Sequence, residues 1–306
     1  MYEDISGKEA ALNHSTITPK TRNKQSEKSS PLAEDTLMNH HHQSTGSLPR
    51  PPVPILYEDN HLYVLIKPAG LLSQADASGD PDLVTRMKAY RKEKEHKPGE
   101  AYIGLVHRLD RPVGGLMVLA KTSKGAARLS QAIREGEFEK YYLAVTTGCP
   151  KQKTGTLTHT LWKDPRTHRV FRVPDTTPGG RRAALKYEVL DTMIPKDQSE
   201  ASLALVHIHL ITGRSHQIRV QFQSIGHPLW GDQRYGETFR VTAKTNPALW
   251  AYALRFPHPT LRTPLYFTAP PPSLPPWSFF KFHQMLPHPN VTGPGAQDLH
   301  VPDLDS

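Results

Sequence analysis

Apolar and polar positions alternate along the middle of the chain, while both ends are polar or rich in proline. Strand patterns lie within 55–72 (two strands around a turn), 115–122, 138–148, 183–193, 201–212, 248–256 and 264–270. Helical spacing predicts helices at 82–95, 123–135 and 215–226, with Asp82, Ser123 and Ser215 as N-caps. Residues 150–182 are rich in turn-forming and basic residues. Because strands and helices do not alternate regularly, we expect an α+β fold with a mixed, largely antiparallel central sheet flanked by helices and loops.

The same patterning divides the chain into three parts. Residues 1–50 lack apolar periodicity and predict a disordered polar tail. Residues 51–282 form the predicted folded domain, and 283–306 predict a flexible C-terminal tail.

Composition narrows the functional class. The net charge of +9 favours a polyanionic partner, because lysine and arginine gain affinity by neutralising phosphates. The single cysteine, Cys149, excludes an intramolecular disulfide and a multi-cysteine zinc site. The sequence has no 18-residue apolar run and no secretory pattern at its start, so we expect a cytoplasmic protein without membrane association. Nothing indicates an obligate protein partner, and we expect a monomer.

A carboxylate stands among arginines at 107–111, where the sequence reads HRLDR. Asp110 lies between Arg108 and Arg111, so it could form a surface ion pair, a structural pair or a catalytic group. The glycines Gly114 and Gly115 lead from it into an apolar run. That placement indicates a loop held by the core, where functional residues concentrate.

A second polar cluster lies at 211–236. Arg214, His216, Gln217 and Arg219 fall within one and a half helical turns. Arg219 is followed by apolar residues and therefore needs a carboxylate partner, for which Asp110 is the natural candidate. The alternative is a basic helix end that faces solvent.

A third pattern is EKYYLAV at 139–145. Strand alternation puts Tyr141 and Tyr142 on opposite faces, so one can enter the core and the other can line a cleft. A cleft tyrosine stacks on flat rings and offers a hydroxyl. Core packing alone would also explain the pair.

Together these segments resemble a known family. The motifs HRLDRPVGGLMVLAKT, KYYLAV, TGRSHQIRVQFQSIGHPLWGDQRYG and ILYEDNHLYVLIKPAGLL are similar to those of the RluA family of RNA pseudouridine synthases, over roughly residues 52–270. The resemblance implies a pseudouridine synthase catalytic fold with a central cleft. It also implies isomerisation of uridine in RNA to pseudouridine, without cofactor or metal.

The resemblance also assigns roles. Asp110 would be the catalytic aspartate, Arg219 its partner, and Tyr142 the ring that packs against the uracil. Arg108 would help displace the target base. The family usually has Thr-Ser where this chain has Val113-Gly114, and often has a histidine in the segment GLLSQ, residues 70–74, which lacks one here.

The chemistry of this reaction fits such a set. The N1–C1′ bond must break, and a carboxylate can attack C1′ or remove a proton at C2′; the sequence leaves both routes open. A paired uridine must first be flipped out, which costs a few kcal/mol. Tyr142 is also a candidate base or relay for the C5 proton. The predicted RNA contacts are His107, Arg108, Lys67, Lys121, Arg214, His216, Gln217 and the basic stretch 163–169, with ribosomal and transfer RNA both open as substrates.

Two other classes compete with this hypothesis. A catalytically idle RNA-binding protein would share the basic charge but would not need Asp110, Tyr142 and Arg219 together. A glycoside or nucleoside hydrolase usually needs a second carboxylate as acid or base. Asp232, in the segment WGDQRYG, is interpreted as the cap of a turn.

Overall fold

The computed structural model describes residues 49–194, 202–236 and 245–281. These residues belong to one compact unit, Ser47–Ser306. Apart from residues 49 and 50, the predicted tails at 1–50 and 283–306 lie outside the described residues.

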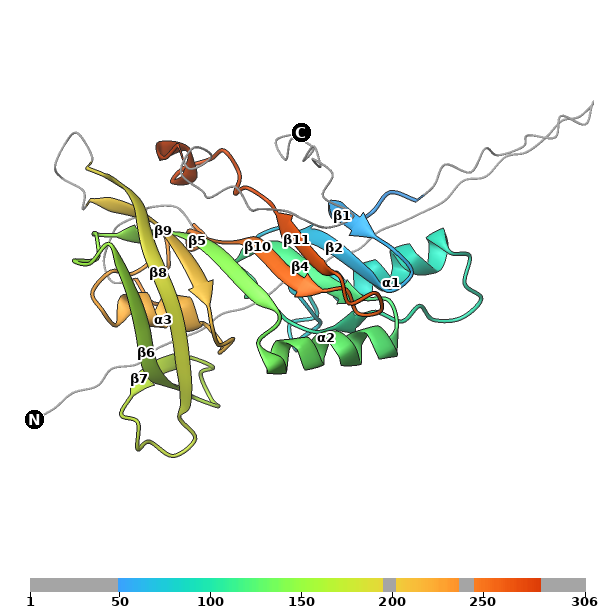
Figure 1. Ribbon diagram of the computed structural model, residues 1–306, viewed down its shortest axis with the longest axis horizontal. Coiled ribbons are helices and arrows are strands. Elements are labelled where there is room, and N and C mark those ends of the chain that lie inside the picture. The colour runs from blue at the N-terminus through green and yellow to red at the C-terminus, as the bar shows by residue number, and fades with distance from the viewer. Residues whose placement is uncertain (1–48, 195–201, 237–244, 282–306) are drawn as a thin grey trace, which may run out of the picture. The chain divides into compact units, whose positions relative to one another are not determined.

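Strands dominate the described residues (Figure 1). In chain order they are β1 (Ile55–Glu58), β2 (Leu62–Lys67), β3 (Gly104–Leu105), β4 (Gly114–Ala120), β5 (Glu139–Thr147), β6 (Thr154–Lys163), β7 (Val170–Val173), β8 (Arg181–Met193), β9 (Leu203–Leu210), β10 (Leu249–Pro257) and β11 (Pro264–Thr268). The helices are α1 (Leu83–Lys94), α2 (Ser123–Glu135) and α3 (Gln217–Gln223), followed by a short 3-10 turn, η1 (Trp277–Phe279).

The described strands form one sheet in the order β1-β2-β4-β10-β5-β9-β8-β6-β7, with β3 beside β4 and β11 beside β10. The β4–β10 pair is parallel and the other named strand pairs are antiparallel. The predicted α+β class with a mixed, largely antiparallel sheet is confirmed. The central position of β5 places Tyr142 in the middle of the sheet.

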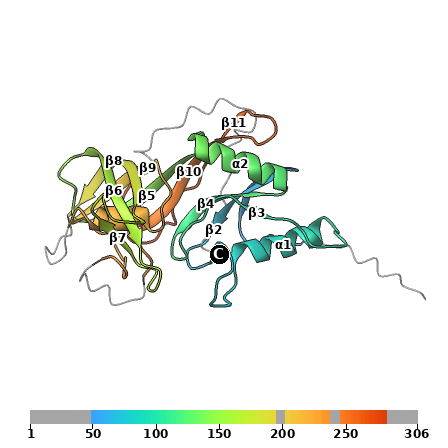
Figure 2. The same cartoon turned by 90° about the horizontal axis from the view of Figure 1, so that it is seen from below.

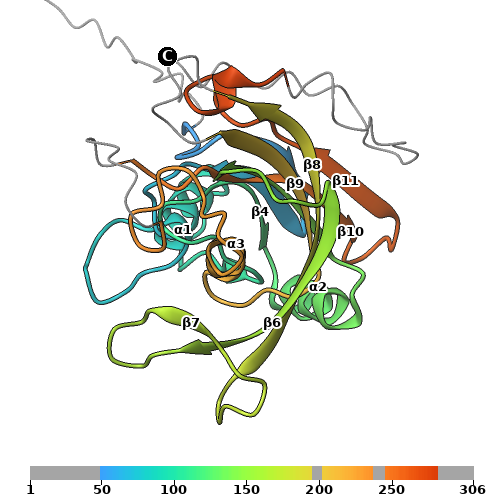
Figure 3. The same cartoon turned by 90° about the vertical axis from the view of Figure 1, so that its left-hand side faces the viewer.

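Helices cover both faces of the sheet. Side chains of α1 and α3 join one apolar cluster, whereas Leu129 of α2 joins the cluster on the other face. The alternation in β2 and β4 explains this division, because neighbouring residues such as Met117 and Val118 enter different clusters. Figure 2 shows α1 and α2 on opposite sides of β2 and β4, and Figure 3 shows α3 within the curve of β6, β8 and β9.

The helix caps agree with the sequence in one case of three. Asp82 caps α1, and its side chain accepts a hydrogen bond from the backbone nitrogen of Thr85. The cap of α2 is Thr122, one residue before the predicted Ser123. The predicted cap of α3, Ser215, is also wrong: the cap position is His216, in a left-handed conformation without a side-chain cap bond.

Residues 150–182 do contain the expected turns, near 164–168 and 174–180, but the sequence does not predict the strands around them. These residues contain β6, β7 and the start of β8, which extend the sheet beyond β9. Strand β6 reads TGTLTHTLWK. Leu157 and Leu161 are buried, but Gly155 and His159 interrupt the apolar alternation on that face, and threonines occupy the mostly exposed alternate positions. Threonine fits strands because its branched side chain packs well on a pleated surface.

Candidate active site

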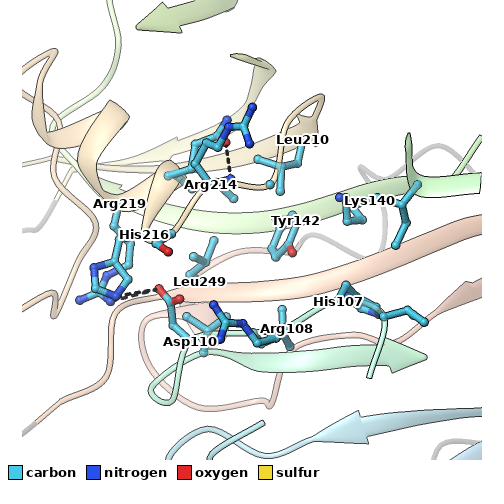
Figure 4. Close-up of a pocket in the computed structure, with 18 of the residues that line it drawn as sticks. His107, Arg108, Asp110, Lys140, Tyr142, Leu210, Arg214, His216, Arg219 and Leu249 are labelled. Carbon is cyan, nitrogen blue, oxygen red and sulfur yellow. Dashed lines mark hydrogen bonds and ion pairs between the residues drawn. The ribbon is translucent and has the colours of Figure 1, made fainter. Parts of the chain in front are cut away.

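A cavity of about 580 Å³ opens in the middle of the described unit (Figure 4). Three segments line it: the loop around 105–113 between β3 and β4, strand β5, and the segment 213–219 that leads into α3. Of the predicted site residues, Asp110, Tyr142, Arg219, Arg108, His107, Arg214, His216 and Gln217 line the cavity. The three sequence clusters therefore meet at one place.

Asp110 sits in a tight turn that the following glycines make possible. Its carbonyl accepts a hydrogen bond from the nitrogen of Val113 at 3.0 Å. Gly115 has φ +118°, and a Cβ there would lie 2.4 Å from the carbonyl oxygen of Ala251. Only glycine satisfies both conditions, so β4 can pair with β10 directly behind the carboxylate.

Two buried side chains, Ser73 and Lys67, hold this loop by hydrogen bonds to its backbone carbonyls. The hydroxyl of Ser73 donates to the carbonyl of Leu109 at 2.7 Å. The ammonium group of Lys67 donates to the carbonyls of Leu71 and Arg111, at 2.7 and 3.3 Å. Both residues flanking Asp110 are thereby held by bonds to the backbone.

Arg219 pairs with Asp110, but its position is set by another carboxylate. The Arg219 Nη1 lies 3.3 Å from Asp110 Oδ2, while its Nε and Nη2 donate to the two oxygens of Asp232 at 2.7 and 2.8 Å. The side chains of Arg219 and Asp232 are 5% and 1% exposed, against 26% for Asp110. Two-point pairing fixes the plane of the guanidinium group.

The electrostatics of this group keep Arg219 charged. Burial lowers the pKa of its guanidinium, but the hydrogen bonds and charge of Asp232, with the charge of Asp110, outweigh burial and raise it. Asp110 therefore faces a permanent cation across the cavity wall.

Tyr142 forms a wall of the same cavity. It projects from β5 on the face that carries the α1 and α3 core, opposite to Tyr141, which stacks on His209 with ring centroids 4.7 Å apart. Burial, followed by the charge of Asp110, raises the pKa of Tyr142. The phenol is therefore neutral at physiological pH and offers a flat face and a hydroxyl.

Two basic side chains that line the cavity, His107 and Lys140, have lowered pKa values. Burial, with the charge of Lys140, lowers the pKa of His107 to about 3. Its Nε2 accepts a hydrogen bond from the nitrogen of Val118 at 2.9 Å, so a neutral ring braces β4. Lys140 lines the cavity two residues before Tyr142, and burial lowers its pKa.

Polar side chains at the cavity's edge differ in what they contact. Arg108 is exposed, and Arg214 is exposed with its Nε bonded to the carbonyl of Arg182. Gln217 is buried, and its amide bonds internally to Thr212 and to backbone atoms of the loop. Arg108 and Arg214 are therefore open to a ligand, whereas Gln217 shapes the loop.

Comparison with known proteins agrees with this architecture. Residues 61–224 match the family model described as RNA pseudouridylate synthase. Among curated proteins, an uncharacterized RNA pseudouridine synthase of Bacillus subtilis, YhcT, is 32% identical over 219 residues, which are 72% of this chain and 68% of that protein. The ribosomal large subunit pseudouridine synthase D of Nitrosomonas europaea is 31% identical over 251 residues, 79% of this chain and 69% of that protein.

The chain belongs to the RNA pseudouridylate synthase family. The predicted RluA-type membership and the enzyme class, an isomerase acting on RNA, are thereby confirmed at the level of the family. The chain matches about two thirds of the length of these relatives. Human RNA pseudouridylate synthase domain containing 4 has the same fold, with a TM-score of 0.59 and 23% identity over 76% of this chain and 92% of that chain.

Two predicted phosphate contacts of this synthase-family chain lie away from the cavity. Lys67 is 0% exposed, and burial lowers its pKa to about 8, partly offset by the charge of Asp110. Lys121 is buried between Glu58 and Glu95, at 2.9 and 3.1 Å. Because neither ammonium group can reach a phosphate, both residues are removed from the candidate RNA contacts.

Sequence reasoning missed the part played by Asp232 and Tyr235. Asp232 does cap its turn, since its Oδ1 accepts from the backbone nitrogens of Arg234 and Tyr235, but it also holds Arg219. The hydroxyl oxygen of Tyr235 lies 2.6 Å from Nδ1 of His216, which lines the cavity. The sequence signal was an arginine next to apolar residues, Arg219, with a carboxylate, Asp232, 13 positions later. Local spacing alone does not show that the two side chains pair.

Within the described ranges, no three His, Cys, Asp or Glu side chains gather in a way that could hold a metal ion. Among the residues that the structure describes, no helix has the length and apolar character needed to cross a membrane.

Proposed function

We propose that this chain isomerises uridines in structured RNA to pseudouridine, with Asp110 as the catalytic carboxylate. The observation that carries the proposal is the contact of Asp110 with Arg219, which Asp232 holds in place at the wall of the cavity. A carboxylate that is paired, partly exposed and fixed by its loop can act on a sugar carbon without leaving its position.

Two routes use this carboxylate. In one, an Asp110 oxygen attacks C1′ and forms an ester as the N1–C1′ electron pair leaves with the uracil. In the other, Asp110 removes the C2′ proton and a glycal forms as the same bond breaks. In both, the uracil turns and a C5–C1′ bond forms. This step breaks the Asp110–C1′ ester in the first route and returns the proton from Asp110 to C2′ in the second. C5 then loses its proton and N1 gains one. Both use the carboxylate of Asp110, which lies 3.3 Å from the guanidinium group of Arg219.

Tyr142 serves this reaction as a neutral ring. Its buried position on β5 supports stacking on a uracil that has left the RNA helix, an interaction worth about 1–3 kcal/mol per base. Because its pKa is raised, the phenol can relay the C5 proton to a stronger base but does not accept it as a phenolate.

Base flipping and RNA binding are assigned to exposed cations. Arg108 stands at the cavity beside Asp110 and is proposed to fill the gap that the flipped base leaves. Arg214 and the segment 163–169 between β6 and β7 are proposed to bind phosphates. The name of a relative, ribosomal large subunit pseudouridine synthase D, supports ribosomal RNA as the proposed substrate, with transfer RNA as the alternative.

The experiment is to incubate purified protein with unmodified ribosomal and transfer RNA transcripts and to map pseudouridine at nucleotide resolution. The proposal predicts defined new sites with the wild type and none with Asp110→Ala. Identical maps for both proteins would contradict it. RNA binding without any new site would favour an idle binding protein, and release of free uracil would favour a hydrolase.

A further inference from the structure

Tyr235 lies where the β6–β7 hairpin meets α3, and it is 4% exposed. Its hydroxyl oxygen accepts a hydrogen bond from the backbone nitrogen of Val170, the first residue of β7, at 3.0 Å. The same oxygen lies 2.6 Å from Nδ1 of His216, the residue before α3. One buried hydroxyl therefore joins the hairpin to the segment that lines the cavity.

The direction of these bonds sets the tautomer of His216. A hydroxyl has one proton to donate, and the Tyr235 oxygen already accepts from Val170. Among the described residues, His216 Nδ1 is the only acceptor within reach of that proton, so the hydroxyl donates to Nδ1 and the ring proton of a neutral His216 resides on Nε2. His216 Nε2 faces Asp110 Oδ2 at 3.9 Å, so a donor is turned toward the carboxylate.

The ring of Tyr235 adds a second connection. The guanidinium carbon of Arg219 lies 5.0 Å from its centroid, and that of Arg169 lies 5.6 Å from it. Arg219 is the partner of Asp110, while Arg169 is an exposed residue of the basic segment 163–169. Cations over an aromatic face are attracted by its quadrupole. Tyr235 thus touches both the proposed RNA-binding hairpin and the cation beside the carboxylate.

The conformation of His216 agrees with a functional constraint. Its φ is +52°, a left-handed value that a residue with a side chain rarely adopts. His216 occupies the cap position, where the chain turns from the loop into α3. Residues held in such conformations cluster at sites where the orientation of the side chain matters.

We propose that Tyr235 is a positioning residue that holds His216 with its Nε2 proton toward Asp110, and so couples the basic hairpin to the catalytic carboxylate. The proposal rests on the function proposed for Asp110. Tyr235 does not touch the reacting atoms; it acts through His216 and Arg219. RNA bound to the hairpin stabilises the position of Val170, and with it the hydrogen bond that orients the site.

The alternative is that Tyr235 only fills space. It packs with Leu161, Val170, Ala183 and Val220 in a small apolar cluster, and a filler would account for its burial. A filler predicts that loss of the hydroxyl changes stability alone. A positioning residue predicts a change in the rate and in the imidazole tautomer.

The test is Tyr235→Phe, which keeps the ring and removes the hydroxyl. Single-turnover kinetics on an unmodified transcript that the wild type converts should show a rate about tenfold lower, the effect of losing one hydrogen bond, with less than twofold change in RNA affinity. Nitrogen-15 NMR of the histidine rings should show the Nε2–H form of His216 in the wild type and its loss in the variant. The matched control is Tyr187→Phe on β8, which removes a partly buried hydroxyl bonded to the carbonyl of Gln152, away from the cavity.

A double variant separates coupling from independent damage. Tyr235→Phe combined with His216→Ala should be no slower than His216→Ala alone, because Tyr235 acts through that imidazole. Unchanged rate and tautomer in Tyr235→Phe, an equal loss in Tyr187→Phe, or multiplying effects in the double variant would each overturn the proposal. If Tyr235→Phe does not fold, the tautomer of the wild type decides: an Nδ1–H ring overturns it and an Nε2–H ring supports it.

These results are distinct from failure of the proposed function. An active Asp110→Asn would refute the function proposed above whatever Tyr235 does. An inactive Asp110→Asn together with a fully active Tyr235→Phe would refute the positioning role alone.

Discussion

Arg219 is held by Asp232 through two hydrogen bonds, at 2.7 and 2.8 Å, and this pair is almost entirely buried. The remaining Nη1 is the group that reaches Asp110, at 3.3 Å. A carboxylate inside the protein thus aims a cation at a carboxylate in the cavity. Because Nε and Nη2 bind Asp232 and only Nη1 reaches Asp110, Arg219 can stay fixed while Asp110 changes its bonding during a reaction.

Asp232→Asn should therefore impair both folding and catalysis. Removing the charge of one member of a buried pair leaves the other uncompensated, so the free energy of unfolding should fall by about 3 kcal/mol. At a temperature where the variant is still folded, the turnover rate should fall by at least about tenfold, because Arg219 is no longer fixed toward Asp110. Denaturant unfolding and single-turnover kinetics measure the two effects.

The control for Asp232 is Asp80→Asn. Asp80 pairs with Arg111 at 2.6 Å, but both side chains are about half exposed, so the pair contributes less than about 1 kcal/mol. A Asp232→Asn variant as stable and active as Asp80→Asn would contradict the account of Arg219.

Tyr142→Leu and Tyr142→Phe should separate stacking from the hydroxyl. The leucine variant loses the aromatic face and should bind the target RNA more weakly by about 1–3 kcal/mol. The phenylalanine variant keeps that face, so its affinity should match the wild type while any rate loss reports the hydroxyl. Titration of fluorescent RNA gives the affinities; equal weakening in both variants would show that stacking is not the role of the ring.

Salt dependence of RNA binding should distinguish exposed cations from buried ones. Arg214→Ala and Arg169→Ala should each reduce the slope of log K against log salt by about one, as expected for one lost phosphate contact. Lys67→Met and Lys121→Met should leave the slope unchanged, because the former ammonium faces backbone carbonyls and the latter faces carboxylates. A reduced slope in Lys67→Met would contradict its assignment to the loop.

His107 should make the protein sensitive to mild acid. Its pKa is about 3 in the folded state, below 6.5 for the free side chain, so its contribution to stability is complete above pH 6.5 and is lost as the pH falls toward 3. Between pH 7.5 and 5.0 the wild type should lose about 2 kcal/mol more than His107→Asn. Denaturant unfolding at both pH values measures the difference.

The control for His107 is His168→Asn, since His168 is exposed in the turn between β6 and β7. That variant should follow the wild type at both pH values. A pH dependence of His107→Asn parallel to the wild type would show that the imidazole is not kept neutral by burial.

The sequence predicts most of the fold because its local signals are strong. Apolar runs give β2, β4, β5, β9 and β10, and an Asx cap with apolar spacing gives α1. It fails at β6 and β7, where glycine, histidine and arginine interrupt the apolar alternation that makes a strand visible. Pairing with β8 decides that segment, and such pairing is not local information.

The candidate site was predicted only in part, for a similar reason. The motifs place Asp110, Arg219 and Tyr142 at one cavity, but Lys67 and Lys121 are basic residues in a basic protein and nothing local reveals their burial. The turn residues around Asp232 predict its role as a cap. They do not predict its additional hydrogen bonds to Arg219. Charge and spacing in the sequence predict which side chains could line a site. The packing of the fold decides which of them reach the cavity and which are buried elsewhere.

The most direct test of the account compares wild type and Asp110→Asn on the same RNA, with binding and single-turnover formation of pseudouridine measured side by side. Asparagine keeps the size of the side chain and removes the charge that pairs with Arg219. The account predicts that RNA affinity stays within about threefold while turnover falls by at least about a thousandfold, the loss of a group that acts on the sugar. Pseudouridine formation by Asp110→Asn at a rate near that of the wild type would contradict it.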